Sequence, residues 1–170
     1  FVQESVTVRP STGRRAPSEY LVVPARVERE GLLMVNGRIG RLPVRIIIDT
    51  GAERTLGNAP LRDALQGRLG AGDRVEDATV IGATPGTHDG VSFLAPMISI
   101  GEARLRDLPV TFGDLHVFEI WGLEDEPALL IGMDLIGSLE RFVVDYRQRE
   151  FHLKLRPSGE KAIPSACGSQ

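Results

Sequence analysis

The sequence predicts an all-β domain whose strands close into a barrel-like sheet. Many short runs of β-branched and other apolar residues lie close together along the chain, and Gly, Pro, Asn and Asp separate them. Residues 44–48 (Val-Arg-Ile-Ile-Ile) are almost all β-branched, which favours a strand because these side chains are stiff at χ1. A single short helix is expected near the C-terminus. Close-spaced short strands of this kind are typical of small barrels.

The 170-residue chain is long enough for one domain with an apolar core. Residues 1–19 are rich in Pro, Ser and Arg without an apolar period, so they predict a flexible leader. Residues 20–156 form the predicted domain, and residues 157–170 predict a flexible tail. Since the first residue is Phe1 rather than Met, we expect a processed product or an excised piece of a longer protein.

Composition narrows the class of protein. The chain is 42% hydrophobic and 25% charged, and no apolar run approaches the ~20 residues of a membrane helix, so we expect a soluble domain. Its compartment stays open, and a periplasmic or membrane-anchored parent protein fits equally well. The formal charge of -3 mixes both signs along the chain and argues against nucleic acid as a partner. The single cysteine, Cys167, rules out an internal disulfide framework.

The first predicted strands lead to an acidic residue. Residues 21–27 predict a strand, and residues 32–35 predict a second strand that ends in an Asn36-Gly37 turn, the strongest short hairpin signal. The return strand, residues 42–48, would deliver Asp49 into the interior.

The remaining elements are a short helix, further strands and a late helical turn. The helix has Pro60 in its first turn. Residues 82–90 predict a long turn between two strands because they are rich in Gly, Pro and Asp. The expected ranges are a helix at 59–65, strands at 78–81, 91–94, 97–101, 108–112 and 128–132, a helical turn at 134–139, and a hairpin of 141–146 with 150–155.

Asp49 is the main candidate for chemistry. It stands where a buried apolar strand breaks into a Gly-containing turn, Asp49-Thr50-Gly51. Burying a carboxylate without a basic partner costs several kcal/mol, which is tolerated where a perturbed pKa has a use. Two carboxylates that share one proton are such a use. The alternative is an ordinary turn capped by the Asp side chain.

The neighbouring segments resemble the retroviral-type, or retropepsin-like, aspartic proteases, and most closely their bacterial and gag-like branch. The resemblance covers residues 32–155 and rests on four segments in the family's order. They are Asp49-Thr50-Gly51-Ala52-Glu53-Arg54-Thr55-Leu56, the flap-like residues 79–86, the strand 96–101, and Leu130-Ile131-Gly132-Met133-Asp134-Leu135-Ile136. An ending similar to Val143-Val144-Asp145-Tyr146-Arg147 is also common in that branch.

This resemblance implies a single protease lobe with a flap hairpin. Asp49 would be the catalytic acid/base, Thr50 would bridge to its symmetry mate, and Gly51 would let the substrate backbone approach. The implied substrate-binding residues are Ala52, Glu53, Ile81, Gly82, Ala83, Thr84, Pro85, Gly86, Ile131 and Gly132. The implied reaction is cofactor-free hydrolysis of peptides. With one Asp-Thr-Gly in the chain, the dyad requires a homodimer.

The chain departs from the viral pattern at two places. Met133 stands where relatives often carry an Arg, which leaves Glu53 without its expected partner. We hypothesise that Arg54 and Asp134 pair instead, the alternative being two solvated charges. Residues 114–127, which include Trp121, have no counterpart in the compact viral enzymes, and they either border the substrate site or simply pack.

Other readings of the sequence stay open or find little support. His88, His116 and His152 lack metal-ligand spacing, so no metal is expected. No serine carries nucleophile-elbow glycines. Two rivals to the homodimeric protease are a non-catalytic dimerisation or peptide-binding module and one lobe of a tandem protease with its second Asp in cis.

Overall fold

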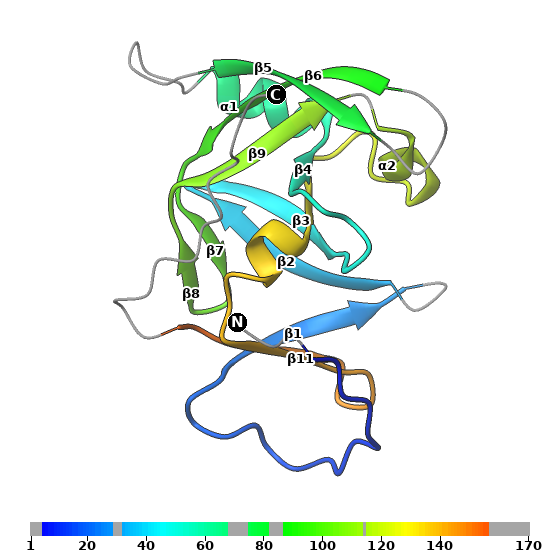
Figure 1. Cartoon of the computed structure of the whole chain (residues 1–170), viewed down its shortest axis with the longest axis vertical. Coiled ribbons are helices and arrows are strands. Elements are labelled where there is room, and N and C mark those ends of the chain that lie inside the picture. The colour runs from blue at the N-terminus through cyan, green and yellow to red at the C-terminus, as the bar shows by residue number, and fades with distance from the viewer. Residues whose placement is uncertain (1–4, 29–31, 68–74, 82–86, 114, 157–170) are drawn as a thin grey trace.

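A computed structural model of the chain describes residues 5–28, 32–67, 75–81, 87–113 and 115–156. These residues form twelve strands and three short helices (Figure 1). The strands are β1 (Leu21–Val27), β2 (Leu33–Ile39), β3 (Leu42–Ile48), β4 (Leu56–Gly57), β5 (Val75–Ile81), β6 (Thr87–Ala95), β7 (Ile98–Ile100), β8 (Ala103–Leu105), β9 (Leu108–Gly113), β10 (Ala128–Ile131), β11 (Arg141–Asp145) and β12 (Glu150–Lys154). The helices are α1 (Ala59–Gln66), α2 (His116–Ile120) and α3 (Met133–Ile136). None of the three is long and apolar enough to cross a membrane.

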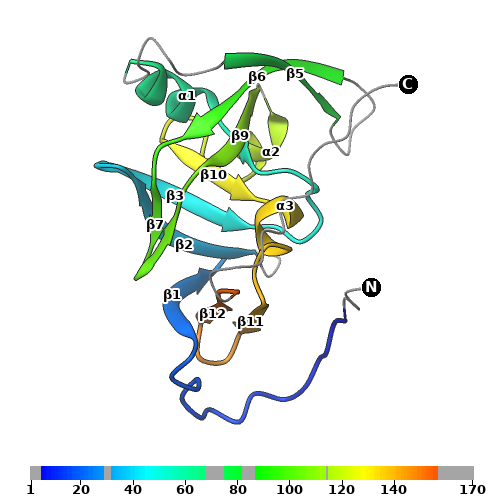
Figure 2. The same cartoon turned by 60° about the vertical axis from the view of Figure 1, so that its left-hand side comes forward.

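The predicted all-β class is confirmed, but the predicted closure of the sheet is wrong. The strands pair in the order β11-β12-β1-β2-β3-β10-β4-β9-β6-β5, with β7 beside β2 and β8 beside β7. The ends of this path, β11 and β5, lie at opposite ends of the molecule (Figures 1 and 2), so they cannot pair with each other. β1 separates the two parts of the sheet. Its residues up to Pro24 pair with β12, and those from Ala25 on pair with β2.

The centre of the fold consists of β3 and the parallel strand β10, which register Ile48 with Ile131. Alternate residues of both strands enter different apolar clusters. Ile46 and Ile48 belong to the larger cluster, whereas Ile47 belongs to the smaller one, and β10 alternates in the same way. Because both faces are covered, these strands are apolar at nearly every position.

The Asn36-Gly37 turn does not form. β2 continues through both residues to Ile39, which is 1% exposed, and the chain turns at Gly40-Arg41 between the paired residues Ile39 and Leu42. Gly40 takes φ +58, as the first central residue of a two-residue hairpin requires. Gly37 serves close packing instead, because a Cβ there would lie 2.2 Å from Ile46 Cδ1. The tertiary contact therefore overrides the local turn signal.

Two other boundaries differ from the prediction. β6 begins at Thr87, opposite Ile81, so the predicted turn of residues 82–90 is shorter than expected, and its tip lies outside the described residues. The late helix starts one residue early, at Met133, and ends at Ile136, although helix-like hydrogen bonds continue to Leu139. The structure also contains α2 and β8, which the sequence analysis did not predict.

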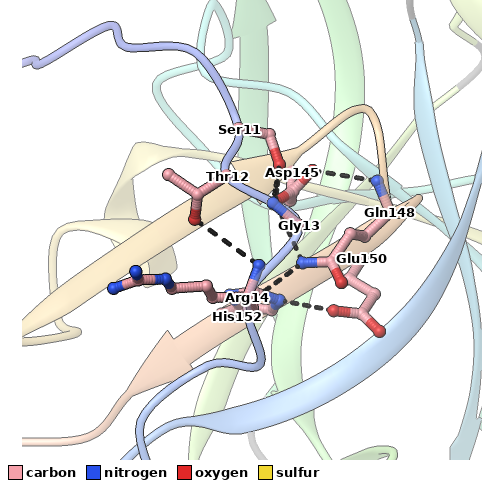
Figure 3. A network of polar contacts seen from close by, with 8 residues as sticks. All are labelled: Ser11, Thr12, Gly13, Arg14, Asp145, Gln148, Glu150 and His152. Atoms are coloured by element: carbon pink, nitrogen blue, oxygen red, sulfur yellow. Dashed lines mark hydrogen bonds and ion pairs between the residues drawn. The ribbon is translucent and has the colours of Figure 1, made fainter.

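The middle of the N-terminal segment docks on the turn between β11 and β12 (Figure 3). Ser11 Oγ donates a hydrogen bond to Asp145 Oδ2 at 2.7 Å. Arg147 Nη1 donates to the Ser11 carbonyl at 3.3 Å, and Gln148 Nε2 donates to the Arg14 carbonyl at 3.1 Å. Residues 5–20 contain no helix or strand, so these contacts hold an irregular segment.

Candidate active site

The order of the strands places the Asp49 turn across the end of β10. β3 and β4 follow each other in the sequence, but β10 lies between them and pairs with both. The chain between β3 and β4, residues 49–55, must therefore pass around the C-terminal end of β10, where Gly132 follows. This crossing brings together two segments that are about 80 residues apart.

Backbone contacts hold Asp49 at this crossing. Its N–H donates to the Ile131 carbonyl at 3.0 Å, and its carbonyl accepts from Ala52 N at 3.3 Å. The Gly51 N–H donates to Asp49 Oδ1 at 2.8 Å, which orients the carboxylate. Among the described residues, no hydrogen bond reaches Asp49 Oδ2. Asp49 is half-buried while Thr50 and Gly51 are exposed, so one carboxylate oxygen is free at the surface of a single chain.

The turn and the segment after β10 are joined by a second pair of backbone hydrogen bonds. Met133 N donates to the Ala52 carbonyl at 2.8 Å, and Asp134 N donates to the Glu53 carbonyl at 3.0 Å. The backbones lie so close that a Cβ on Gly132 would be 2.5 Å from the Arg54 carbonyl oxygen. A glycine is therefore needed at this position.

The carboxylate of Asp134 fastens the far end of the turn. Its Oδ1 accepts from Thr55 Oγ1 at 2.7 Å, and its Oδ2 accepts from Thr55 N at 2.8 Å. Leu135 N also donates to Oδ1, at 2.8 Å. Thr55 is 1% exposed, and its Oγ1 accepts in turn from Gly132 N at 3.3 Å. The threonine thus links Asp134 to the glycine that packs on the turn.

The expected pair of Arg54 and Asp134 is not formed. No ion pair among the described residues includes Arg54. Both oxygens of Asp134 are already occupied by the buried residue next in sequence, Thr55. Arg54 and Glu53 are exposed, so both charges are solvated without a partner.

A buried asparagine anchors the segment that contains α2. The Asn58 amide donates to the carbonyls of Leu123 and Glu126, both at 2.7 Å, and its oxygen accepts from Leu61 N and Ala128 N. It is 3% exposed and also caps α1. The sequence analysis missed this residue, although an Asn just before Ala-Pro is a common helix N-cap signal. Thr55 carried no such local signal.

The remaining predicted site residues fall into two groups. Ile131 and Gly132 are buried beside the turn, and the Ile131 side chain belongs to the larger core cluster. In the hairpin of β5 and β6, the backbone of Ile81 ends β5. Residues Gly82, Ala83, Thr84, Pro85 and Gly86 lie outside the described residues. The described residues contain no cluster of His, Cys, Asp and Glu suited to a metal ion.

Comparison with known proteins agrees with this arrangement. The sequence profile of the aspartyl protease family matches residues 19–135, which is more than half of the chain. The fold is similar to the crystal structure of a retropepsin-like aspartic protease from Rickettsia conorii, with a TM-score of 0.53 and 17% sequence identity over 80% of this chain and 90% of that one. A search of curated protein sequences gave no match. The matched segment includes both halves of the crossing at Asp49, and we conclude that this chain belongs to the aspartyl protease family and has a retropepsin-like fold.

Proposed function

We propose that this protein is an aspartic endopeptidase in which the Asp49 carboxylates of two copies of the chain form the catalytic dyad. The observation that carries the proposal is the half-buried Asp49, oriented by Gly51 N–H through one oxygen and free at the other. The chain contains one Asp-Thr-Gly, so a second carboxylate has to come from a second copy. Family membership supports hydrolysis of peptide bonds.

The reaction follows from two carboxylates close together. Like charges at about 3 Å cannot both ionise, so the pair shares one proton. The ionised Asp49 takes a proton from a water molecule, whose oxygen attacks the peptide carbonyl carbon. The protonated Asp49 of the other copy gives its proton to the carbonyl oxygen. When the tetrahedral intermediate breaks, the C–N bond is cleaved and the leaving nitrogen takes up a proton.

The positions of the other predicted residues suit this reaction. Thr50 and Gly51 are exposed in a single chain, which is where a second copy and an extended peptide would need to approach. Ala52 and Glu53 continue the same turn, and the hairpin of β5 and β6 would supply residues 81–86 as a flap over the peptide. An extended peptide would gain hydrogen bonds from such backbone segments.

The test is to mix the wild-type chain with Asp49→Asn and refold the mixture. If the dyad combines two copies, mixed dimers are inactive, and an equal mixture retains about one quarter of the wild-type cleavage rate. A single-carboxylate site would retain about half. The variant alone should be inactive and retain the circular dichroism spectrum of the wild type.

Solution mass separates the rival assemblies. A dimer that cleaves casein and is inhibited by pepstatin would support the proposal. A dimer without cleavage indicates a binding module, and an inactive monomer indicates a lobe that needs a different partner. Undiminished cleavage by Asp49→Asn would overturn the proposed chemistry.

A further inference from the structure

The segment of α2 packs on the same apolar cluster as the Asp49 turn. The smaller cluster contains Phe118 and Leu123 of this segment together with Ile47 and Leu130 of the central strands. Its outer members are only partly buried, and they come from several parts of the chain. These outer members are Leu32, Ala52, Leu56, Val117 and Trp121.

Ala52 connects this cluster to the site. It is the residue directly after Gly51, its N–H bonds to the Asp49 carbonyl, and it is itself half-buried. Val117 and Trp121 are therefore partly exposed apolar groups on the same cluster as a residue of the Asp49 turn. Ile120, between them in sequence, is 65% exposed. Figure 1 shows α2 beside one end of the hairpin of β5 and β6, on the same side of the molecule as the chain that follows β3.

The α2 segment is held firmly enough to act as a binding surface. Leu123 N donates to the Phe118 carbonyl at 2.8 Å, and the Leu123 carbonyl accepts from the buried Asn58. Phe118 is 2% exposed and ties the helix to the core. A surface whose supporting residues are fixed in this way needs little ordering when a ligand binds.

We propose that Val117, Ile120 and Trp121 form an apolar wall of the peptide-binding site, which selects substrates with a large apolar side chain next to the scissile bond. This inference rests on the proposed peptidase function. An extended peptide at Asp49 must pass Ala52, and a large apolar side chain there would cover the exposed rim of the cluster. Burial of such a side chain gives a gain that a small polar one lacks.

Cleavage-site mapping tests the inference without a known substrate. The wild type and Trp121→Ala are each incubated with denatured casein, and the cut sites are identified by mass spectrometry. We expect the wild type to prefer large apolar residues next to the cut, and Trp121→Ala to lose about tenfold or more in kcat/KM on those sites, with little change on sites flanked by small residues. Trp121→Phe should keep the preference. Val22→Ala, which alters an exposed apolar residue on β1, is the matched control.

The fluorescence of Trp121 gives a second measurement that needs no cleavage. Trp121 is the only tryptophan in the chain, so its emission reports on this surface alone. Pepstatin, an apolar peptide inhibitor, should shift the emission of Asp49→Asn, and Ile120→Ser should weaken the binding. If the wild type cleaves casein but Trp121→Ala keeps the same preference, the wall is refuted and the protease remains. If nothing is cleaved but pepstatin still shifts the emission, the wall is supported as a binding surface and the protease is refuted.

Discussion

Two aspartates, Asp134 and Asp145, each fasten one segment of the chain to another, but in different surroundings. Asp134 bonds to Thr55, which is 1% exposed, and so joins the Asp49 turn to the segment after β10. Asp145 bonds to Ser11 and Gln148 at the surface, where the N-terminal segment meets the β11–β12 turn (Figure 3). Water can replace the partners of Asp145 but not those of Asp134. The same chemistry should therefore be structural in one place and adjustable in the other.

Removal of the buried fastening should have the largest effect. Asp134→Ala leaves the Thr55 hydroxyl and amide without an acceptor, and we expect a loss of about 3 kcal/mol in the free energy of unfolding. Cleavage should fall as well, because the turn that carries Asp49 loses its anchor. Urea unfolding measures the first effect, and Asp134→Asn, which keeps one acceptor oxygen, should lose less. The comparison fails if Asp134→Ala costs no more than Asp145→Ala.

The close approach beside this network should also be sensitive. In Gly132→Ala the new methyl group would lie 2.5 Å from the Arg54 carbonyl oxygen and 2.9 Å from that of Ala52, so backbone must shift. We expect a loss of about 2 kcal/mol on urea unfolding. Gly67→Ala is the control, since a Cβ there meets nothing within 4 Å. Equal stability of the two variants would show that the crossing at Asp49 is loosely packed.

The surface fastening should respond to pH. The backbone N–H of Gln148 and then the Ser11 hydroxyl bond to the Asp145 carboxylate and lower its pKa below the model value of 3.8. The stabilisation is therefore complete well above pH 3.8 and is lost as the pH falls through that value to the folded-state pKa. Because Asp145 is solvated, we expect less than about 1 kcal/mol. Unfolding of the wild type and Asp145→Asn across this range measures it, and parallel curves would contradict the assignment.

The smallest effect is expected at the other partner of Asp145. Ser11→Ala removes one exposed hydrogen bond, so the free energy of unfolding should change by less than about 0.5 kcal/mol. The N-terminal segment should nevertheless open more often, and trypsin should cut faster after the exposed Arg14 and Arg15. Ser18→Ala, an exposed serine nearby, should leave the rate unchanged. Identical cutting of the two variants would mean that Ser11 does not hold the segment.

Much of the fold was predictable because it depends on local patterns. The β-branched run before Asp49, the strands β1, β10 and β11, and the hairpin of β11 and β12 all follow from short stretches of sequence. Helix α1 followed from Pro60 in its first turn. The prediction failed where a contact between distant residues outweighs the local signal, as at Gly37, which packs against Ile46 instead of turning.

The sequence by itself determined that an acidic residue ends a buried strand and that the chain carries one such motif. Only the tertiary structure decided what surrounds it. Asp134 bonds to Thr55 across 79 positions, and α2 shares an apolar cluster with Ala52. The physical reason is the insertion of β10 between β3 and β4. This topology makes the Asp49 turn pass around the end of a strand that the chain reaches only much later.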